Sequence, residues 1–361
     1  MNELIVSSSP HSKDHRTVRS IMAYVLIALS PVAAASVIYF KWRALLLIAI
    51  SVISCVFFEF IYNMLMKRKQ TISDCSAIVT GVLLAFSLPV STPLWLPPIG
   101  ALVAIIIVKM LFGGLGKNIF NPAAAGYLFL FLIFSNFVSG SWTKPFDSVS
   151  SATPLEYLKN ASGELVTIGD KFSIFDCMVG NIPGGLGETS AVLLMLGGLF
   201  LIYKKVITWH IPVSFIGTVA VITFFFPRFD DILAFQYMQY HLFSGGLFLA
   251  AFFMATDYSS GPITPLGRII YGMGCGLITV LIRYFGGYPD GVCFAILIMN
   301  CFARYLDTKT IPKSFGRERR VFIRYDGFAE ALYKLKTFFI VKSNKVSVPE
   351  TVDVPVNENE E

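Results

Sequence analysis

Residues 21–40, I-M-A-Y-V-L-I-A-L-S-P-V-A-A-A-S-V-I-Y-F, decide the fold class. This run carries no charge over roughly 20 positions, enough for a helix to cross the roughly 30 Å of hydrocarbon in a bilayer. Three basic residues stand just before it: Lys13, Arg16 and Arg19. A cleaved signal peptide has a shorter apolar core, of about 7–15 residues. We therefore expect a retained helix, and the small residues at 31–35 leave a cleaved signal as the alternative.

The composition extends this interpretation to the rest of the chain. Of its 361 residues, 55% are hydrophobic and only 14% are charged, whereas soluble domains carry about 25% charged residues. The charges avoid the long apolar runs, as a bilayer requires. We expect an all-α polytopic membrane protein with about ten spans, at roughly 21–40, 44–62, 76–88, 99–112, 122–138, 190–203, 210–227, 241–256, 267–285 and 288–306.

Two parts of the sequence carry a similar pattern. Lys109 and the F-G-G at 112–114 end the fourth span, and Arg283 and the F-G-G at 285–287 end the ninth. A short span and a proline-bearing loop precede each of them. Short, interrupted spans at matching positions are typical of inverted repeats, although small residues at helix ends also serve close packing. We expect residues 20–138 and 190–308 to form two inverted repeats of about five helices each.

The distribution of basic residues predicts the orientation. Lys and Arg are more frequent on one side of the predicted spans, including the run from Lys309 to Arg320, and such an excess marks the cytoplasmic side. The tails at 1–19 and 309–361 are therefore expected in the cytoplasm. The loop at 139–189 is expected outside it. The net charge of +6 reflects this topology and indicates no nucleic-acid partner.

The outer loop contains S-S-A-T-P-L at residues 150–155. The hydroxyl of Thr153 follows two small residues, and Pro154 comes after it. On these letters alone, a Ser/Thr/Pro turn without chemistry is the better interpretation. The alternative is that the hydroxyl carries a phosphoester that tethers a flavin.

Several longer motifs carry a family resemblance. They are G-G-L-G-K-N-I-F-N-P-A-A-A-G (113–126), the Thr153 segment, G-N-I-P-G-G-L-G-E-T-S (180–190), F-M-A-T-D (253–257) and R-Y-F-G-G-Y-P-D-G-V-C-F-A-I-L-I-M-N (283–300). In this order they resemble the D-subunit family of the Rnf electron-transport complex, which is related to the B subunit of the sodium-pumping NADH:quinone reductase. The resemblance covers about residues 20–316.

The resemblance implies a fold similar to urea transporters and a place in the cell (inner) membrane, within a complex with subunits A, B, C, E and G. That complex moves electrons between reduced ferredoxin and NAD and couples them to Na⁺ or H⁺ transport. The chain would be one subunit of this oxidoreductase and would not be catalytic alone. The alternatives are a urea-transporter-like channel without a redox role, and a scaffold that docks redox partners.

The resemblance also implies a flavin mononucleotide (FMN) joined to threonine by a phosphoester in an S/T-G-A-T motif, attached by a separate flavin transferase. Thr153 occupies the attachment position, and Ser151 stands where the family usually has glycine. The expected pocket around this FMN comprises Ser151, Ala152, Pro154, Gly184, Gly187, Glu188 and Thr189. For the 180–190 loop the alternative is a helix start, capped by Thr189 or Ser190.

Asn118 and Asn121 are the second candidate site. The resemblance implies that their motif contacts a non-covalent riboflavin, and carboxamides both donate and accept hydrogen bonds. The alternative for Asn121 is a helix cap in front of Pro122.

The remaining polar residues favour structural roles. The six cysteines and four histidines show no metal-ligand spacing, so we expect no metal site. Lys109 and Arg283 lie near span ends, where snorkelling to the interface is the expected behaviour. Glu59 is the most embedded carboxylate. Residues 328–341 fit a helix on the membrane surface.

Overall fold

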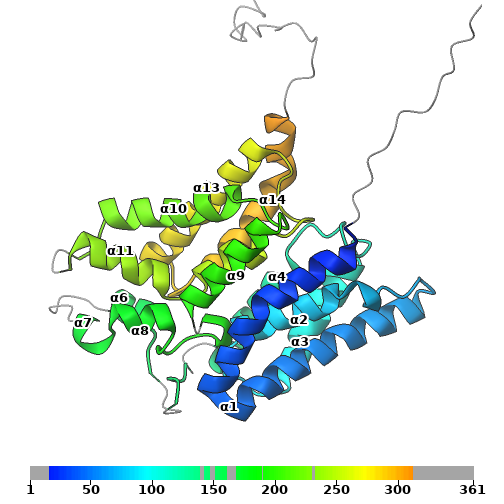
Figure 1. The fold of residues 1–361 in the computed structure, drawn as a ribbon, viewed down its shortest axis with the longest axis horizontal. Coiled ribbons are helices and arrows are strands. Elements are labelled where there is room, and N and C mark those ends of the chain that lie inside the picture. The colour runs from blue at the N-terminus through cyan, green and yellow to red at the C-terminus, as the bar shows by residue number, and fades with distance from the viewer. Residues whose placement is uncertain are drawn as a thin grey trace, which may run out of the picture. The chain divides into compact units, whose positions relative to one another are not determined.

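The computed structural model describes residues 16–138, 142–146, 151–160, 168–188, 190–229 and 232–311. The chain divides into a compact unit, Met1–Ile311, and a second unit, Pro312–Glu361. The second unit lies outside the described residues, with its predicted surface helix, and so do Ser150, Thr189 and most of the predicted N-terminal tail. The described elements are helices, and no named strand occurs among them (Figure 1).

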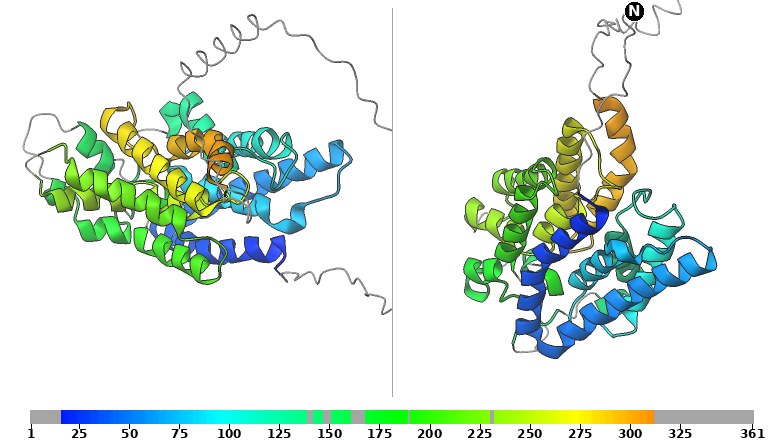
Figure 2. Two further views of the ribbon diagram at one scale, coloured as in Figure 1. Left: turned by 90° about the horizontal axis from the view of Figure 1, so that it is seen from above. Right: turned by 45° about the vertical axis from the view of Figure 1, so that its right-hand side comes forward.

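The first helix, α1 (Val18–Leu65), holds the first two predicted spans in one element with a sharp bend. The bend lies at Lys41, whose φ of 54° and ψ of −140° are not helical. Its two arms diverge from this point (Figure 2). At the start of α1, Thr17 and Ser20 cap each other, because each side chain accepts a hydrogen bond from the other's N–H. The prediction of two consecutive apolar helices is confirmed.

Short helices follow, as the sequence predicts. After the single turn η1 (Ile72–Asp74) come α2 (Ser76–Ser87), α3 (Leu96–Leu102) with its π-helical continuation η2 (Val103–Met110), α4 (Pro122–Ile133) and α5 (Ser135–Val138). The 12 residues of α2 extend about 18 Å, well short of the roughly 30 Å of hydrocarbon. Such a helix ends at membrane depth, so other parts of the protein must satisfy its ends.

The connecting region supplies those partners. It contains α6 (Pro154–Asn160), α7 (Ile168–Lys171), α8 (Ile174–Val179) and the turn η3 (Leu186–Glu188). Just past the end of α2, the backbone N–H of Leu186 donates to the carbonyl of Leu88 (3.0 Å). The hydroxyl of Ser36, in the first arm of α1, donates to the carbonyl of Leu186 (2.7 Å). The 184–188 loop therefore closes the end of the short helix.

The second half also combines longer and shorter helices. It consists of α9 (Ala191–Tyr203), α10 (His210–Phe225), α11 (Ala234–Phe243), α12 (Leu247–Leu249) with its π-helical continuation η4 (Ala250–Met254), α13 (Pro265–Phe285) and α14 (Val292–Thr310). Ser190 caps α9, since its hydroxyl accepts from the N–H of Leu193, as one of the two sequence interpretations expects. The predicted span at 241–256 is interrupted at residues 244–246, between α11 and α12.

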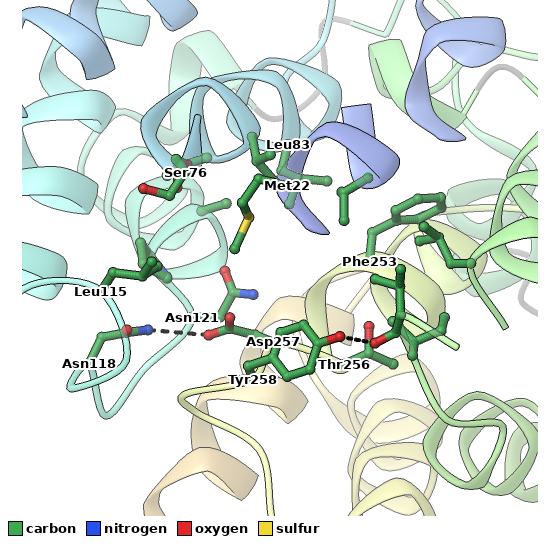
Figure 3. A pocket seen from close by; sticks show the side chains of 18 of the residues that line it. Met22, Ser76, Leu83, Leu115, Asn118, Asn121, Phe253, Thr256, Asp257 and Tyr258 are labelled. Atoms are coloured by element: carbon green, nitrogen blue, oxygen red, sulfur yellow. Dashed lines mark hydrogen bonds between the residues drawn. The ribbon is translucent and has the colours of Figure 1, made fainter. Parts of the chain in front are cut away.

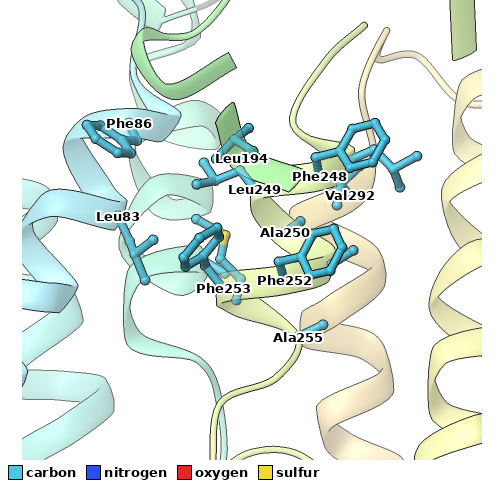
Figure 4. Close-up of a cluster of buried hydrophobic side chains, with 14 of the residues drawn as sticks. Leu83, Phe86, Leu194, Phe248, Leu249, Ala250, Phe252, Phe253, Ala255 and Val292 are labelled. Carbon is cyan, nitrogen blue, oxygen red and sulfur yellow. The ribbon is translucent and has the colours of Figure 1, made fainter. Parts of the chain in front are cut away.

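The largest apolar cluster joins the two halves of the compact unit. Leu83 and Phe86 of α2 lie across from Leu249 and Phe253 of α12 and η4 (Figure 4). Helix α1 packs against α2 and α3 and also against α9, and α13 packs against α10 and α14. Of the described helices, α1 and α13 are long and apolar enough to cross a membrane, and five other apolar helices are shorter. A mostly helical architecture is confirmed.

Candidate functional site

A cavity lies between α1, α2, the loop before α4, and η4, with about 710 Å³ of atom-free space that is partly open to solvent (Figure 3). We call it the asparagine cavity, because Asn118 and Asn121 both line it. Its wall is largely apolar and includes the rings of Phe252 and Phe253. The other polar residues that line it are Ser76, Thr80, Lys109, Thr256, Asp257 and Tyr258. This lining, mostly apolar with a few polar groups, is typical of a small-molecule site.

Asn121 joins two elements of the cavity wall. Its side-chain oxygen accepts from the N–H of Ala124 (3.1 Å), so the residue caps α4, and the cap prediction is confirmed. Its side-chain nitrogen donates to the carbonyl of Met254 (2.8 Å), the last residue of η4. The cap of a helix in the first half thereby holds the end of a short helix in the second half.

Asn118 makes a second link across the same cavity. Its amide nitrogen donates to the carbonyl of Phe120 and to the carboxylate of Asp257 (3.2 Å), and its oxygen accepts from the hydroxyl of Ser259 (2.5 Å). Asp257 also accepts from Ser260 (2.9 Å). Both asparagines therefore face the cavity with most of their hydrogen-bonding capacity already used within the chain. The sequence did not single out Asp257 as the partner of Asn118.

Lys109 contradicts the snorkelling prediction. Its side chain is only 2% exposed, and its ammonium lies 2.8 Å from the carboxylate of Glu59 and 2.8 Å from the hydroxyl of Ser76. Glu59 is 1% exposed, as expected of the most embedded carboxylate, and its second oxygen accepts from Thr71. A buried charge is costly unless it is paired. The ion pair explains why Lys109 stays inside and does not reach the interface.

A second cavity contains two carboxyl groups. We call it the carboxylate cavity, because Glu188 and Asp290 line it together with Ser87, Tyr127 and Cys293. One oxygen of Glu188 accepts from the N–H of Gly185 (3.0 Å). Glu188 lies in the loop before α9, and burial raises its pKa to about 7, with the carboxylate of Asp290 adding to the shift.

Arg283 also contradicts the snorkelling prediction. It is 3% exposed, and its guanidinium donates to the carboxylate of Asp290 (3.1 Å) and to the carbonyl of His241 (2.6 Å). The other oxygen of Asp290 accepts from the N–H of Gly246 (3.0 Å). Arg283 and Asp290 thus bind both sides of the break between α11 and α12, because His241 precedes it and Gly246 ends it.

The two buried cations occupy related positions. A residue with left-handed backbone precedes each short helix, Cys75 (φ 60°) before α2 and Gly245 (φ 78°) just before α12. Lys109 donates to Ser76, the residue directly after Cys75. Arg283 pairs with Asp290, and Asp290 in turn accepts from the N–H of Gly246, the residue directly after Gly245. In each half, the basic residue shortly before the F-G-G motif forms an ion pair with an acidic residue. Each pair lies beside the start of a short helix. The sequence predicted the repeat from these letters but not this contact.

Thr153 begins a short helix. Its side chain is half-buried, and its hydroxyl accepts from the N–H of Glu156 (3.1 Å), at the start of α6. The preceding residues Ser151 and Ala152 are exposed, whereas Pro154 is buried. The backbone N–H of Ser151 donates to the carbonyl of Trp142 (2.9 Å). Thr153 is therefore half-buried in a segment that these two hydrogen bonds anchor.

The 184–188 loop and α6 approach the same break. Leu155 of α6 lies beside Gly245, where a Cβ atom would come within 2.8 Å of its side chain, and Glu188 lies beside Gly246. Gly184 and Gly187 are buried, and Thr189 lies outside the described residues. No described contact joins Thr153 directly to this loop. A small cavity near α6 is lined by Lys159, Arg228, His241 and Arg283. The sequence did not predict that these four residues lie together.

Comparisons with known proteins agree on one family. The model of the NQR2, RnfD, RnfE family matches residues 5–316. The chain is 44% identical, over 88% of its length and 97% of the relative, to the D subunit of the Na⁺-translocating ferredoxin:NAD⁺ oxidoreductase complex of Acetobacterium woodii. It is 42% identical, over 88% of its length and 98% of the relative, to the proton-translocating counterpart of Clostridium ljungdahlii.

The chain belongs to the NQR2, RnfD, RnfE family. A more distant member, the D subunit of the ion-translocating oxidoreductase complex of Halorhodospira halophila, is 33% identical over 88% of this chain and 97% of its own length. The family match includes the asparagine motif, the Thr153 segment and both buried ion pairs, because all of them lie within residues 5–316.

Resemblance to the NQR2, RnfD, RnfE family implies a flavin at two positions, and the residue types at both include groups that can contact one. The asparagine cavity has aromatic rings and several polar groups in its wall, and about 80 Å³ of free space. Thr153 presents a half-buried hydroxyl behind two exposed small residues.

No metal centre is evident in the part of the chain that the structure describes. Within those ranges, no three His, Cys, Asp or Glu side chains form a group that could hold a metal ion. All six cysteines are free thiols.

Proposed function

We propose that this chain is the flavin-bearing membrane subunit of an ion-translocating ferredoxin:NAD oxidoreductase complex. It would work with subunits A, B, C, E and G of that complex in the cell (inner) membrane. The family match and the names of the relatives support this assignment. The observation that carries it in the structure is the asparagine cavity, where α2, η4 and the loop before α4 bring aromatic and polar side chains together.

Thr153 is the proposed attachment point of FMN. When bound, this cofactor accepts and gives up electrons, while the protein supplies position and electrostatics. The phosphoester uses the phosphate and leaves the flavin ring free. The bond of Ser151 to Trp142 and the cap of Thr153 on α6 hold the attachment point in place. A flavin transferase would install the group.

Riboflavin in the asparagine cavity is the second proposed cofactor. Asn118 and Asn121 line the cavity at the loop that the sequence motif marks. Because their amides already bond to Asp257 and Met254, they shape the cavity wall and contribute only their remaining lone pairs and N–H groups. The aromatic wall of Phe252 and Phe253 would pack against the flavin ring.

The proposed topology is two inverted repeats, with both termini in the cytoplasm and Thr153 outside it. The excess of basic residues on one side supports this orientation. The related positions of Lys109 and Arg283 beside the two short helices support the repeat. The two flavins would then lie near opposite faces, about 30 Å of hydrocarbon apart, so electrons need an intermediate stop in this subunit or in a partner.

The two cavities supply a candidate ion path. Helix α2 contributes Ser76 and Thr80 to the asparagine cavity and Ser87 to the carboxylate cavity, and α4 likewise lines both. The cavities therefore follow one another along the same helices, with the apolar side chains of Figure 4 close to both. The relatives are named for Na⁺ in one case and for protons in the other, so vesicles containing the complex must be assayed for both ions.

In-gel fluorescence after full denaturation tests the covalent flavin. The chain and its Thr153→Ala variant are expressed together with the flavin transferase. We expect a fluorescent band for the native chain and a dark band for the variant. A dark native band, with the transferase active on a control substrate, would refute the covalent flavin and favour a channel without a redox role. Binding of the other subunits without any flavin would instead favour a scaffold.

A further inference from the structure

A larger cavity lies at the bend of α1, between the bend, the loop after α2 and the 142–146 segment. It holds about 370 Å³ of free space, against about 80 Å³ in the asparagine cavity. Its wall combines the aromatic rings of Tyr39 and Phe146 with three cationic side chains, those of Lys41, Arg43 and Lys144. We call it the basic cavity, because no acidic residue of the described chain lines it.

Hydrogen bonds and ring contacts join the segments of this wall. The N–H of Phe146 donates to the carbonyl of Tyr39 (3.4 Å), and the two rings meet edge to face with their centroids 5.3 Å apart. On the other side, the guanidinium of Arg43 donates to the carbonyl of Val90 (2.8 Å), in the loop after α2. The basic cavity is therefore built from three segments that contact one another.

The three cations of the wall keep their charge. Lys41, Arg43 and Lys144 are exposed, and none of them forms an ion pair with another described residue. The hydrogen-bond partners of Arg43 are backbone carbonyls, which do not compensate its charge. Like charges around one space repel one another. An anion in the basic cavity would remove that repulsion and accept charge-assisted hydrogen bonds.

The position of the bend indicates the source of this anion. The first arm of α1, from Val18 to the bend, is long enough to cross the hydrocarbon of a bilayer, so the bend lies at one surface of the membrane. On the same bend, Ile38 is 66% exposed and Trp42 is 67% exposed. Trp is frequent at membrane–water interfaces. A phospholipid matches both features, because it joins an anionic phosphate to apolar acyl chains.

We propose that the basic cavity binds the phosphate of an anionic phospholipid, whose acyl chains cover Ile38 and Trp42. The lipid would hold together the three segments of the cavity wall. This inference requires a membrane but no flavin, so it goes beyond the proposed function. Because the N–H of Ser151 donates to the carbonyl of Trp142, the bound lipid would also stabilise the segment that leads to Thr153.

The test is native mass spectrometry of the full-length chain in detergent, titrated with phosphatidylglycerol, which is anionic, or with phosphatidylcholine, which has no net charge. The variant is Lys41→Gln combined with Lys144→Gln, which leaves the hydrogen bonds of Arg43 in place. The matched control is Lys67→Gln combined with Lys69→Gln. It removes two exposed cations that do not line the basic cavity, and Lys67 has a left-handed backbone (φ 51°) as Lys41 has (φ 54°).

We expect the native chain and the control to bind phosphatidylglycerol more tightly than phosphatidylcholine. The Lys41/Lys144 variant should bind phosphatidylglycerol more weakly by about tenfold or more, since it lacks two of the three cations. Its melting temperature in phosphatidylcholine should equal that of the native chain. An unchanged affinity of this variant for phosphatidylglycerol would overturn the proposal, because the lipid would then bind elsewhere.

Three further results would assign the basic cavity to another occupant and overturn the proposal. Equal affinity of the native chain for both lipids would favour an acidic segment of a partner subunit. Inorganic phosphate that raises the melting temperature as much as phosphatidylglycerol does would favour a free anion. Binding of phosphatidylglycerol by the Thr153→Ala chain, but not by the chain that carries a flavin, would favour the tethered flavin.

Discussion

The ammonium of Lys109 and the carboxylate of Glu59 form an ion pair at 2.8 Å, although the two residues are 50 positions apart in the chain. The pair joins η2 to the second arm of α1 and, through Ser76, to the start of α2. One buried contact therefore ties together three helices that the sequence presents as separate apolar runs.

Breaking this pair on one side should destabilise the protein strongly. Glu59→Gln or Lys109→Met alone leaves an uncompensated buried charge, which costs about 3–5 kcal/mol. The double variant should recover most of that loss, because no charge remains to be buried. Thermal unfolding in detergent measures all three variants against the native chain. A double variant that is as unstable as both single variants would contradict this account.

Gly187 should not tolerate a side chain. A Cβ atom at this position would lie 2.4 Å from the Cβ of Phe86, so Gly187→Ala must push η3 away from α2. Overpacking of this kind costs about 1–3 kcal/mol. The matched control is Gly217→Ala in α10, where a Cβ meets no atom within 4 Å and alanine favours the helix by about 1 kcal/mol. Equal melting temperatures for the two variants would refute the close approach.

Glu188 should make stability depend on pH. Its pKa rises from the ordinary 4.5 to about 7 in the folded chain, so the folded state binds a proton that the unfolded state has released. The resulting stabilisation is complete below about pH 4.5 and is lost as the pH rises through about 7. The melting temperature of the native chain should fall over this window. Glu188→Gln should reduce the dependence of the melting temperature on pH in this window. An unchanged dependence in the variant would contradict the raised pKa of Glu188.

Ser151 should be neutral for flavin attachment. Its side chain is exposed, and its contact with Trp142 uses the backbone N–H. Ser151→Gly, which restores the residue usual in the family, should leave in-gel fluorescence at the native level. Thr153→Ala provides the dark reference. A marked gain of fluorescence in Ser151→Gly would mean that the hydroxymethyl group obstructs the transferase.

Local signals predicted the elements well. The short helices at α2 and α3 and the cap by Asn121 before Pro122 follow from run length, proline and side-chain oxygen. Each of these depends on a few neighbouring residues. The interruption at 244–246 within the predicted span 241–256, by contrast, was not expected. The motif at 113–126 also identified both asparagines of the cavity, which the structure brings together with Asp257 and Met254.

The same local signals did not predict which residues far apart in the sequence form ion pairs. Lys109 and Arg283 lie near span ends, which predicts snorkelling, yet both are buried against carboxylates. The sequence did hold one clue, since an embedded Glu59 and an embedded Lys109 each need an opposite charge. The contacts of Asp290 and His241 with Arg283 were not predicted. They depend on where the break between α11 and α12 lies in space, which neighbouring residues in the sequence do not determine.

The bend at Lys41 bears on biogenesis. The two arms of α1 meet at Lys41 and have no loop between them, so only the short stretch that contains Lys41 and Arg43 has to cross the membrane with them. We expect these arms to enter the bilayer together as one hairpin, before the helices that follow them in the chain. Helices α2, α3 and α9, which pack against α1, would then assemble on a platform that is already in place.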